Sequence, residues 1–132
     1  MQESGLLEPL PAVRLSDGTL KFLCLLAVLL SPEIPPLICV EEPETGLHPD
    51  AIKIVAAALI DASERTQLIV TTHSEALIDA LSHRPEDVLV CERDFDNGTQ
   101  FRRLDREQLA SWLERYTLGA LWRKGELGGT RW

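Results

Sequence analysis

The sequence predicts an α/β fold: a mostly parallel sheet with flanking helices, ending in an antiparallel hairpin and a C-terminal helix. Two short apolar runs, Leu37–Val40 and Leu68–Val70, indicate the strands. The first is bounded by prolines, which is typical of a strand buried on both faces of a parallel sheet. The segment between the runs has apolar residues at helical spacing. Alternation of strands and helices requires right-handed crossovers, so we expect parallel strands.

Helix starts are predicted from capping residues. Ser16 is a favourable N-cap for an apolar helix that extends to Leu30, because its hydroxyl can accept from a free N–H of the first turn. Pro49 and Asp50 suit the first turn of the next helix, and Ser74 is the expected N-cap of a third. The first helix is apolar around most of its circumference, which predicts a core helix packed on several sides.

The C-terminal part is predicted as strand, hairpin and helix. Asp87–Glu92 is an expected third strand, and Asp96–Gly98 an expected hairpin turn. Thr99–Leu104 would then add an antiparallel strand at the sheet edge. An amphipathic helix is expected next, marked by Leu109, Trp112, Leu113 and Tyr116. The tail that follows is glycine-rich, and its expected apolar anchors are Leu118, Leu121 and Trp122. Residues 1–14 are expected to be a poorly structured lead-in.

Composition restricts the classes of partner and the compartment. With 45% apolar and 26% charged residues, the 132-residue chain is ordinary for a soluble globular protein. Its net charge of −8 argues against broad electrostatic binding to DNA or to anionic membranes. The apolar stretch Leu20–Leu30 is about half as long as the roughly 20 residues of a membrane span. Cys24, Cys39 and Cys91 are predicted to be buried free thiols in a reducing compartment, so we expect a cytoplasmic protein without membrane partners.

Two adjacent carboxylates, Glu41 and Glu42, end the first predicted strand. Open α/β sheets bind their ligands at the C-terminal ends of strands. Neighbouring carboxylates repel each other when they are poorly solvated, and a hard divalent cation such as Mg²⁺ is the usual means of offsetting that repulsion. The alternative is an acidic surface loop whose glutamates are simply hydrated.

Four short motifs follow one another within about 60 residues: Leu15–Lys21, Leu37–Glu42, Pro43–Pro49 and Thr71–Ser74. In this order they resemble the signature motif, Walker B strand, D-loop and switch-histidine loop of ATPases of the ATP-binding-cassette (ABC) type. The resemblance is to the group that includes the structural-maintenance and recombination ATPases and the overcoming-lysogenization-defect (OLD) nucleases. It implies that residues 15–132 are the C-terminal part of an ABC-type domain, a partial P-loop NTPase fold.

The resemblance implies roles for the carboxylates and for one histidine. Glu41 would hold Mg²⁺ through water, although transporters usually have aspartate there. Glu42 would polarise the attacking water, as general base or as a positioning group. His73 would hydrogen-bond the terminal phosphate of ATP; the alternative is an ordinary polar residue at a strand end. His83 is expected to be a plain loop residue.

The signature and D-loop motifs imply contacts to a second copy. Ser16 and Gly18 would contact the terminal phosphate of an ATP held by the opposing subunit, since glycine permits close backbone approach and the helix start offers free N–H groups. Asp17 is unfavourable beside a phosphate unless it points away. His48 belongs to the D-loop motif, where it either faces the partner subunit or structures the turn.

The sequence has no Gly-x-x-x-x-Gly-Lys-Ser/Thr motif, so no backbone loop of this chain is expected to cradle phosphates. A P-loop-containing segment or chain must therefore supply the Walker A part, and the resemblance implies a homodimer or head-to-tail dimer around ATP. We expect no hydrolysis by this chain alone. DNA could be bound only through parts that this sequence does not contain.

Two other classes of function are a non-catalytic binding module and a metal-dependent nuclease. The chain could be a non-catalytic interaction or remnant module that binds a partner ATPase through its signature and D-loop surface. A metal-dependent nuclease is disfavoured, because no further acidic cluster of that kind follows His73.

Overall fold

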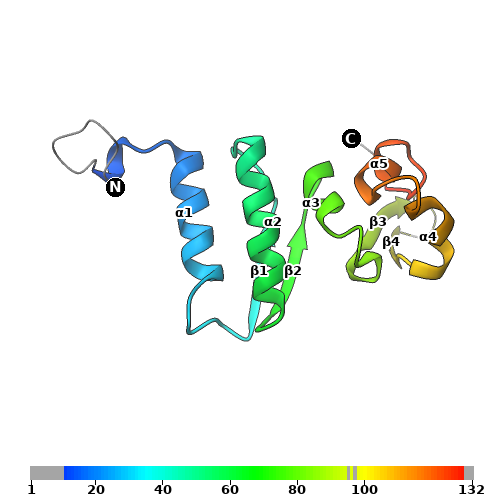
Figure 1. The fold of residues 1–132 in the computed structure, drawn as a ribbon, viewed down its shortest axis with the longest axis horizontal. Coiled ribbons are helices and arrows are strands. Elements are labelled where there is room, and N and C mark those ends of the chain that lie inside the picture. Colours follow the sequence, from blue (N-terminus) through cyan, green and yellow to red (C-terminus); the bar gives the residue numbers. More distant parts are fainter. Residues whose placement is uncertain (1–10, 95, 97, 130–132) are drawn as a thin grey trace. The chain divides into compact units, whose positions relative to one another are not determined.

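The computed structural model describes residues 11–94, 96 and 98–129 (Figure 1). The chain divides into two compact units, Met1–Thr71 and Thr72–Trp132, and each has its own two-stranded sheet. In the part of the chain that the structure describes, no helix combines the length and apolarity that crossing a membrane requires.

The first unit is a β-α-β arrangement preceded by a helix. Its elements are η1 (Ala12–Arg14, a 3-10 turn), α1 (Asp17–Leu29), β1 (Leu37–Glu41), α2 (Pro49–Ser63) and β2 (Gln67–Thr71). β1 and β2 pair in parallel, with Leu37 opposite Gln67 and Glu41 opposite Thr71. α2 contacts both α1 and β2, and Figure 1 shows α1 beside α2, with β2 on the side of α2 away from α1. The predicted parallel pairing is confirmed for these two strands.

Local capping explains where the helices of this unit begin. The Ser16 Oγ accepts from the backbone N–H of Thr19 at 3.1 Å, so the predicted N-cap of α1 is confirmed. α2 begins at Pro49, as predicted, and the Nδ1 atom of His48 accepts from the N–H of Asp50 at 3.3 Å. Both caps satisfy N–H groups that have no partner within the helix.

The prediction that the first strand, β1, is buried on both faces is wrong for this chain. Burial alternates along each strand, and Leu37 and Ile69 are 47% and 52% exposed. The reason is that α2 packs against only one face of the sheet. α1 is also less covered than predicted, although it packs against α2 and meets the Glu42–Gly46 turn: its only buried residue is Leu29, and Cys24 is exposed.

The second unit contains a hairpin and short helices. Its elements are α3 (Glu75–Ala80), η2 (Pro85–Asp87, a 3-10 turn), β3 (Leu89–Asp94), β4 (Gly98–Arg103), α4 (Arg106–Leu113) and α5 (Leu118–Arg123). The predicted antiparallel hairpin is confirmed, with Leu89 opposite Arg103 and Asp94 opposite Gly98. Ser74 caps α3 as predicted, accepting from the N–H of Leu77 at 3.4 Å.

Three predictions for this unit need correction. β3 does not extend the parallel sheet: it pairs with β4 in a separate sheet. The strand begins at Leu89 rather than Asp87, because Pro85 opens a 3-10 turn that includes Asp87. Cys91, like Cys24 and Cys39, is a free thiol as predicted but is exposed rather than buried. Of the predicted hairpin turn, Asn97 lies outside the described residues.

The core of the second unit gathers apolar residues from its helices and hairpin: Ile78, Val90, Leu104, Leu118, Leu121 and Leu127. Leu118 and Leu121 are fully buried and Trp122 packs against the cluster, which confirms the predicted anchors of the tail. Polar contacts also hold the start of α5 against α3 and against Ser82, which follows α3. The Asp79 carboxylate accepts from the N–H of Gly119 at 2.7 Å, and the Ser82 hydroxyl accepts from the N–H of Leu118 at 3.0 Å.

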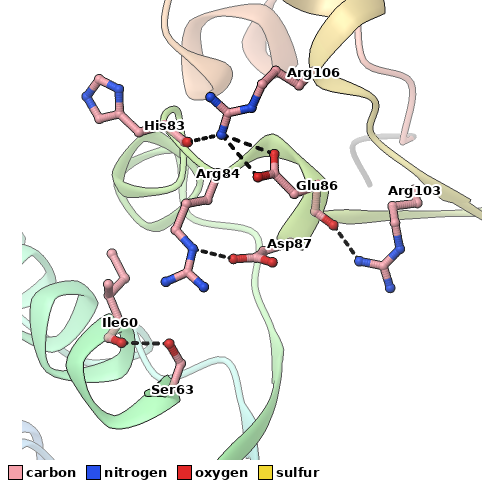
Figure 2. A network of polar contacts seen from close by, with 8 residues as sticks. All are labelled: Ile60, Ser63, His83, Arg84, Glu86, Asp87, Arg103 and Arg106. Carbon is pink, nitrogen blue, oxygen red and sulfur yellow. Dashed lines mark hydrogen bonds and ion pairs between the residues drawn. The ribbon is translucent and has the colours of Figure 1, made fainter.

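A polar network joins η2 to β4 and α4 (Figure 2). The Arg106 guanidinium donates to both carboxylate oxygens of Glu86, at 3.0 and 3.3 Å, and to the carbonyl of His83. Arg84 pairs with Asp87 at 2.7 Å. Arg103 donates to the carbonyl of Glu86. The pKa of Glu86 is lowered, chiefly by a hydrogen bond from its own backbone and then by the one from Arg106.

Candidate functional site

Glu42 has an unusual backbone conformation at the end of β1. Its φ is +40°, and it is the only non-glycine residue with positive φ among those that the structure describes. Its N–H donates to the carbonyl of Thr71 at 2.9 Å, which continues the β1–β2 ladder past Glu41. A left-handed non-glycine residue costs about 1–3 kcal/mol, and such residues gather at functional sites. Of the two adjacent glutamates, Glu42 is therefore the one with a strained backbone.

The two glutamates lie in different surroundings. Glu41 is exposed and belongs to the open face of the sheet, in alternation with the half-buried residues of β1. Glu42 is half-buried, and its Oε2 atom accepts from the Thr45 hydroxyl at 3.2 Å. Solvation of Glu41 reduces the repulsion that was expected from two neighbouring carboxylates.

The N-terminus of α1 abuts the Glu42–Gly46 turn. A Cβ atom built on Gly18 would overlap the carbonyl oxygen of Gly46, so this position accepts only glycine without a backbone shift. Lys21, further along α1, donates from Nζ to the carbonyl oxygens of Glu42 at 2.9 Å and Thr45 at 3.1 Å. The first unit therefore brings the Ser16–Gly18 helix start and Glu42 together, although they are more than 20 residues apart in sequence.

The turn itself is closed by its own backbone. The N–H of Thr45 donates to the carbonyl of Glu42 at 3.1 Å, and that of Leu47 donates to the carbonyl of Glu44 at 3.0 Å. Gly46 has a φ of +79°, which glycine adopts without steric cost. Because the Glu42 carbonyl accepts from both Thr45 and Lys21, its two lone pairs are used.

The two candidate histidines belong to different units. His48 caps α2, and its side chain is 76% exposed, with Nδ1 3.5 Å from the Asp50 carboxylate. Of its two expected roles, structuring the turn is the one for which a contact is present. His73 belongs to the second unit and is exposed, in the segment between β2 and α3. That segment is held by the Thr72 hydroxyl, which accepts from the N–H of Ser74 at 2.9 Å.

The carboxylates fit Mg²⁺ only as a partial ligand set. Among residues 11–94, 96 and 98–129, no group of three or more His, Cys, Asp or Glu side chains is placed to hold a metal ion. An all-protein metal cage is therefore absent from the described part. Mg²⁺, however, is usually held by one or two carboxylates together with waters and substrate phosphates. The exposed carboxylate of Glu41, at the C-terminal end of a parallel strand, fits that type of site.

Lys21 and Thr45 are site residues that the sequence alone did not single out. Thr45 lies three residues after Glu42 in a turn, a spacing at which hydroxyls often bond nearby groups. Lys21 gave no comparable local signal, because its partners lie 21 and 24 residues away.

Residues 1–79 match the model of the family described as "AAA domain, putative AbiEii toxin, Type IV TA system". This match covers more than half of the chain, so the chain belongs to that family of AAA-type ATPase domains. The matched region contains all four motifs.

A particular relative is the Old nuclease of Escherichia phage P2, which is 38% identical over 74 residues. The alignment covers 55% of this chain but only 12% of the nuclease. Together, these matches identify the chain as a member of the AAA/OLD-like P-loop ATPases.

Proposed function

We propose that this chain supplies the signature motif, Walker B strand, D-loop and switch histidine of an ABC/SMC-like ATP site. The Walker A loop belongs to another segment or chain, and the chain alone does not hydrolyse ATP. The observation that carries the proposal is the junction of α1 with the Glu42–Gly46 turn, because it packs the proposed signature segment directly against the turn that follows the proposed Walker B strand. Family membership supports the nucleotide chemistry.

The carboxylates divide the work in this proposal. Glu42 polarises the attacking water. Its backbone is strained, and its carboxylate accepts a hydrogen bond from the Thr45 hydroxyl. Glu41 holds Mg²⁺ through water, and Mg²⁺ when bound neutralises charge on the phosphates. Phosphoryl transfer needs little covalent chemistry from the protein, so correct placement of these groups is most of the catalysis.

The helix start and the histidines act on the phosphates and on the second copy. Ser16 and Gly18 at the N-terminus of α1 contact the terminal phosphate of an ATP bound by the opposing subunit, where free N–H groups favour an anion. His73 hydrogen-bonds the terminal phosphate of ATP and responds to its loss. His48 caps α2 directly after the D-loop, and it either structures this turn or faces the partner. The assembly is a homodimer or head-to-tail dimer around ATP.

The test is Mg²⁺-dependent ATP hydrolysis by the chain isolated with the P-loop partner that co-purifies from its source cells. Glu42→Gln is expected to lower kcat by about 100-fold or more, within the usual range for loss of a general base. Glu33→Gln is the matched control, since Glu33 is an exposed carboxylate in the loop between α1 and β1. Equal kcat values for Glu42→Gln and the control would contradict the proposal.

The second candidate is a non-catalytic module that binds a partner ATPase. The exposed apolar side chains of Leu37 and Ile69 on the open face of the sheet favour association with another protein. In this case the partner co-purifies, but its ATP turnover is unaffected by Glu42→Gln. The same pair of variants therefore separates the two functions.

A further inference from the structure

Lys21 connects α1 to both ends of the turn that carries Glu42. Its Nζ atom donates to the carbonyl of Glu42 at 2.9 Å and to that of Thr45 at 3.1 Å. A lysine ammonium has three donors and no acceptor, so two of its three hydrogens are directed at backbone oxygens of one turn. The contacts lie within the first unit, where α1 and this turn are packed together.

The turn needs such a support because its conformation is costly. Glu42 has a φ of +40°, and a residue in this region persists only when its surroundings determine it strongly. The Glu42 N–H donates to the carbonyl of Thr71, and the Glu42 carbonyl accepts from the N–H of Thr45 and from Lys21. Of these three partners, Lys21 is the one that belongs to a helix. Removing its ammonium takes away the contacts that tie the turn to α1.

We propose that Lys21 is a positioning residue, which holds the Glu42–Thr45 backbone and thereby orients the Glu42 carboxylate without touching ATP. This inference rests on the proposed function. It adds a coupling, because α1 also carries Ser16 and Gly18, and Gly18 abuts Gly46. The helix that carries Ser16 and Gly18 is thereby tied through Lys21 to the backbone that carries Glu42.

The first experiment is amide hydrogen exchange on the 132-residue chain, with Lys21→Met, Lys21→Arg and Lys53→Met compared with wild type. Methionine keeps most of the apolar stem but removes the donors, and Lys53 is an exposed lysine on α2 that serves as control. Exchange at Thr45, whose N–H bonds the Glu42 carbonyl, should become roughly tenfold faster in Lys21→Met. It should stay within about twofold of wild type in Lys53→Met, with Lys21→Arg between the two.

Protection of the buried α2 amides of Val55 and Ala58 shows that the variant is folded. If it is lost in Lys21→Met, the comparison rests on Lys21→Arg, which retains a donor. The inference is overturned if Lys21→Met is folded and its Thr45 amide exchanges at the same rate as in Lys53→Met. This outcome does not depend on whether the chain is active.

The second experiment measures Mg-ATP hydrolysis with the P-loop partner. Lys21→Met should lower kcat by about tenfold or more, because small misplacement of a catalytic group is costly, while KM for ATP stays within about twofold of wild type. Lys21→Arg should recover part of kcat. A rise in KM at unchanged kcat would assign Lys21 to ATP binding and overturn its positioning role. If the wild type itself shows no turnover, the proposed function fails, and the exchange data still decide whether Lys21 holds the turn.

Discussion

At the scale of single residues, Glu42 combines a poor backbone conformation with a reactive side chain. A glycine would adopt a φ of +40° at lower cost, so stability alone does not explain a glutamate at this position. The opposite holds for Gly18, where the packing against Gly46 excludes any side chain. These two residues give predictions of opposite sign.

Glu42→Gly is expected to raise the free energy of unfolding by about 0.5–1 kcal/mol, because it relieves the left-handed strain, while abolishing hydrolysis with the P-loop partner. Urea denaturation measures the first effect. Glu41→Gly is the matched control: Glu41 is extended in β1, so glycine there should destabilise by about 0.5–1 kcal/mol. Destabilisation by both substitutions would show that the Glu42 side chain, rather than its backbone, dominates the stability at that position.

Gly18→Ala is expected to destabilise the chain by about 1–3 kcal/mol, since the new methyl group would overlap the Gly46 carbonyl and force a backbone shift. The neighbouring Asp17→Ala is the control, because Asp17 is exposed in the first turn of α1. Its effect should be limited to loss of a favourable dipole interaction, about 0.3–1 kcal/mol. Thermal or urea unfolding of the two variants distinguishes close packing from a general weakness of the helix start.

At the scale of elements, the signals that the sequence predicted well are local ones. Ser16, Pro49 and Ser74 begin their helices as predicted, because a cap depends on a few adjacent residues. Burial of β1 was predicted wrongly, because the apolar run Leu37–Val40 does not specify what covers it. The contact of Lys21 with Glu42 was missed for the same reason: it depends on how α1 packs.

The junction of α3 and α5 depends on a cap supplied by another helix. Asp79→Ala removes the acceptor for the N–H of Gly119 and should lower the stability of the second unit by about 1–2 kcal/mol. Asp79→Asn keeps an acceptor oxygen and should recover most of this loss. Hydrogen exchange at Leu121, which is fully buried in α5, reports the effect. If Asp79→Asn loses as much stability as Asp79→Ala, the negative charge of Asp79 matters more than its hydrogen bond to the Gly119 N–H.

The link from η2 to α4 predicts a pH dependence. Since the pKa of Glu86 is lower in the folded state than in the unfolded one, its stabilising effect is present above its ordinary pKa and is lost as pH falls through the folded value. Glu86→Gln should therefore reduce stability at pH 7, with a difference from wild type that shrinks toward acid pH. A difference that stays constant from pH 7 to acid pH would contradict this role of Glu86. Urea titrations at several pH values provide the comparison.

At the scale of the whole molecule, charge governs the expected partners. Thirteen basic and 21 acidic residues give a net charge of −8, which opposes accumulation on the phosphate backbone of DNA. We predict no binding of this chain to mixed-sequence duplex DNA at micromolar concentrations and physiological salt, as measured by fluorescence anisotropy. Salt-dependent binding in that range would indicate a local basic surface that outweighs the net charge, and would bring DNA into the proposed function.

The exposed thiols allow the distance between the two units to be measured in solution. Cys39 lies on β1 of the first unit and Cys91 on β3 of the second, and each is free. With Cys24 replaced by alanine, a donor and an acceptor fluorophore attached to the remaining pair would report the separation of the two units in solution. A change in energy transfer on adding Mg-ATP and the P-loop partner would show that the distance between the two units changes. One of these units carries Glu42 and the other carries His73.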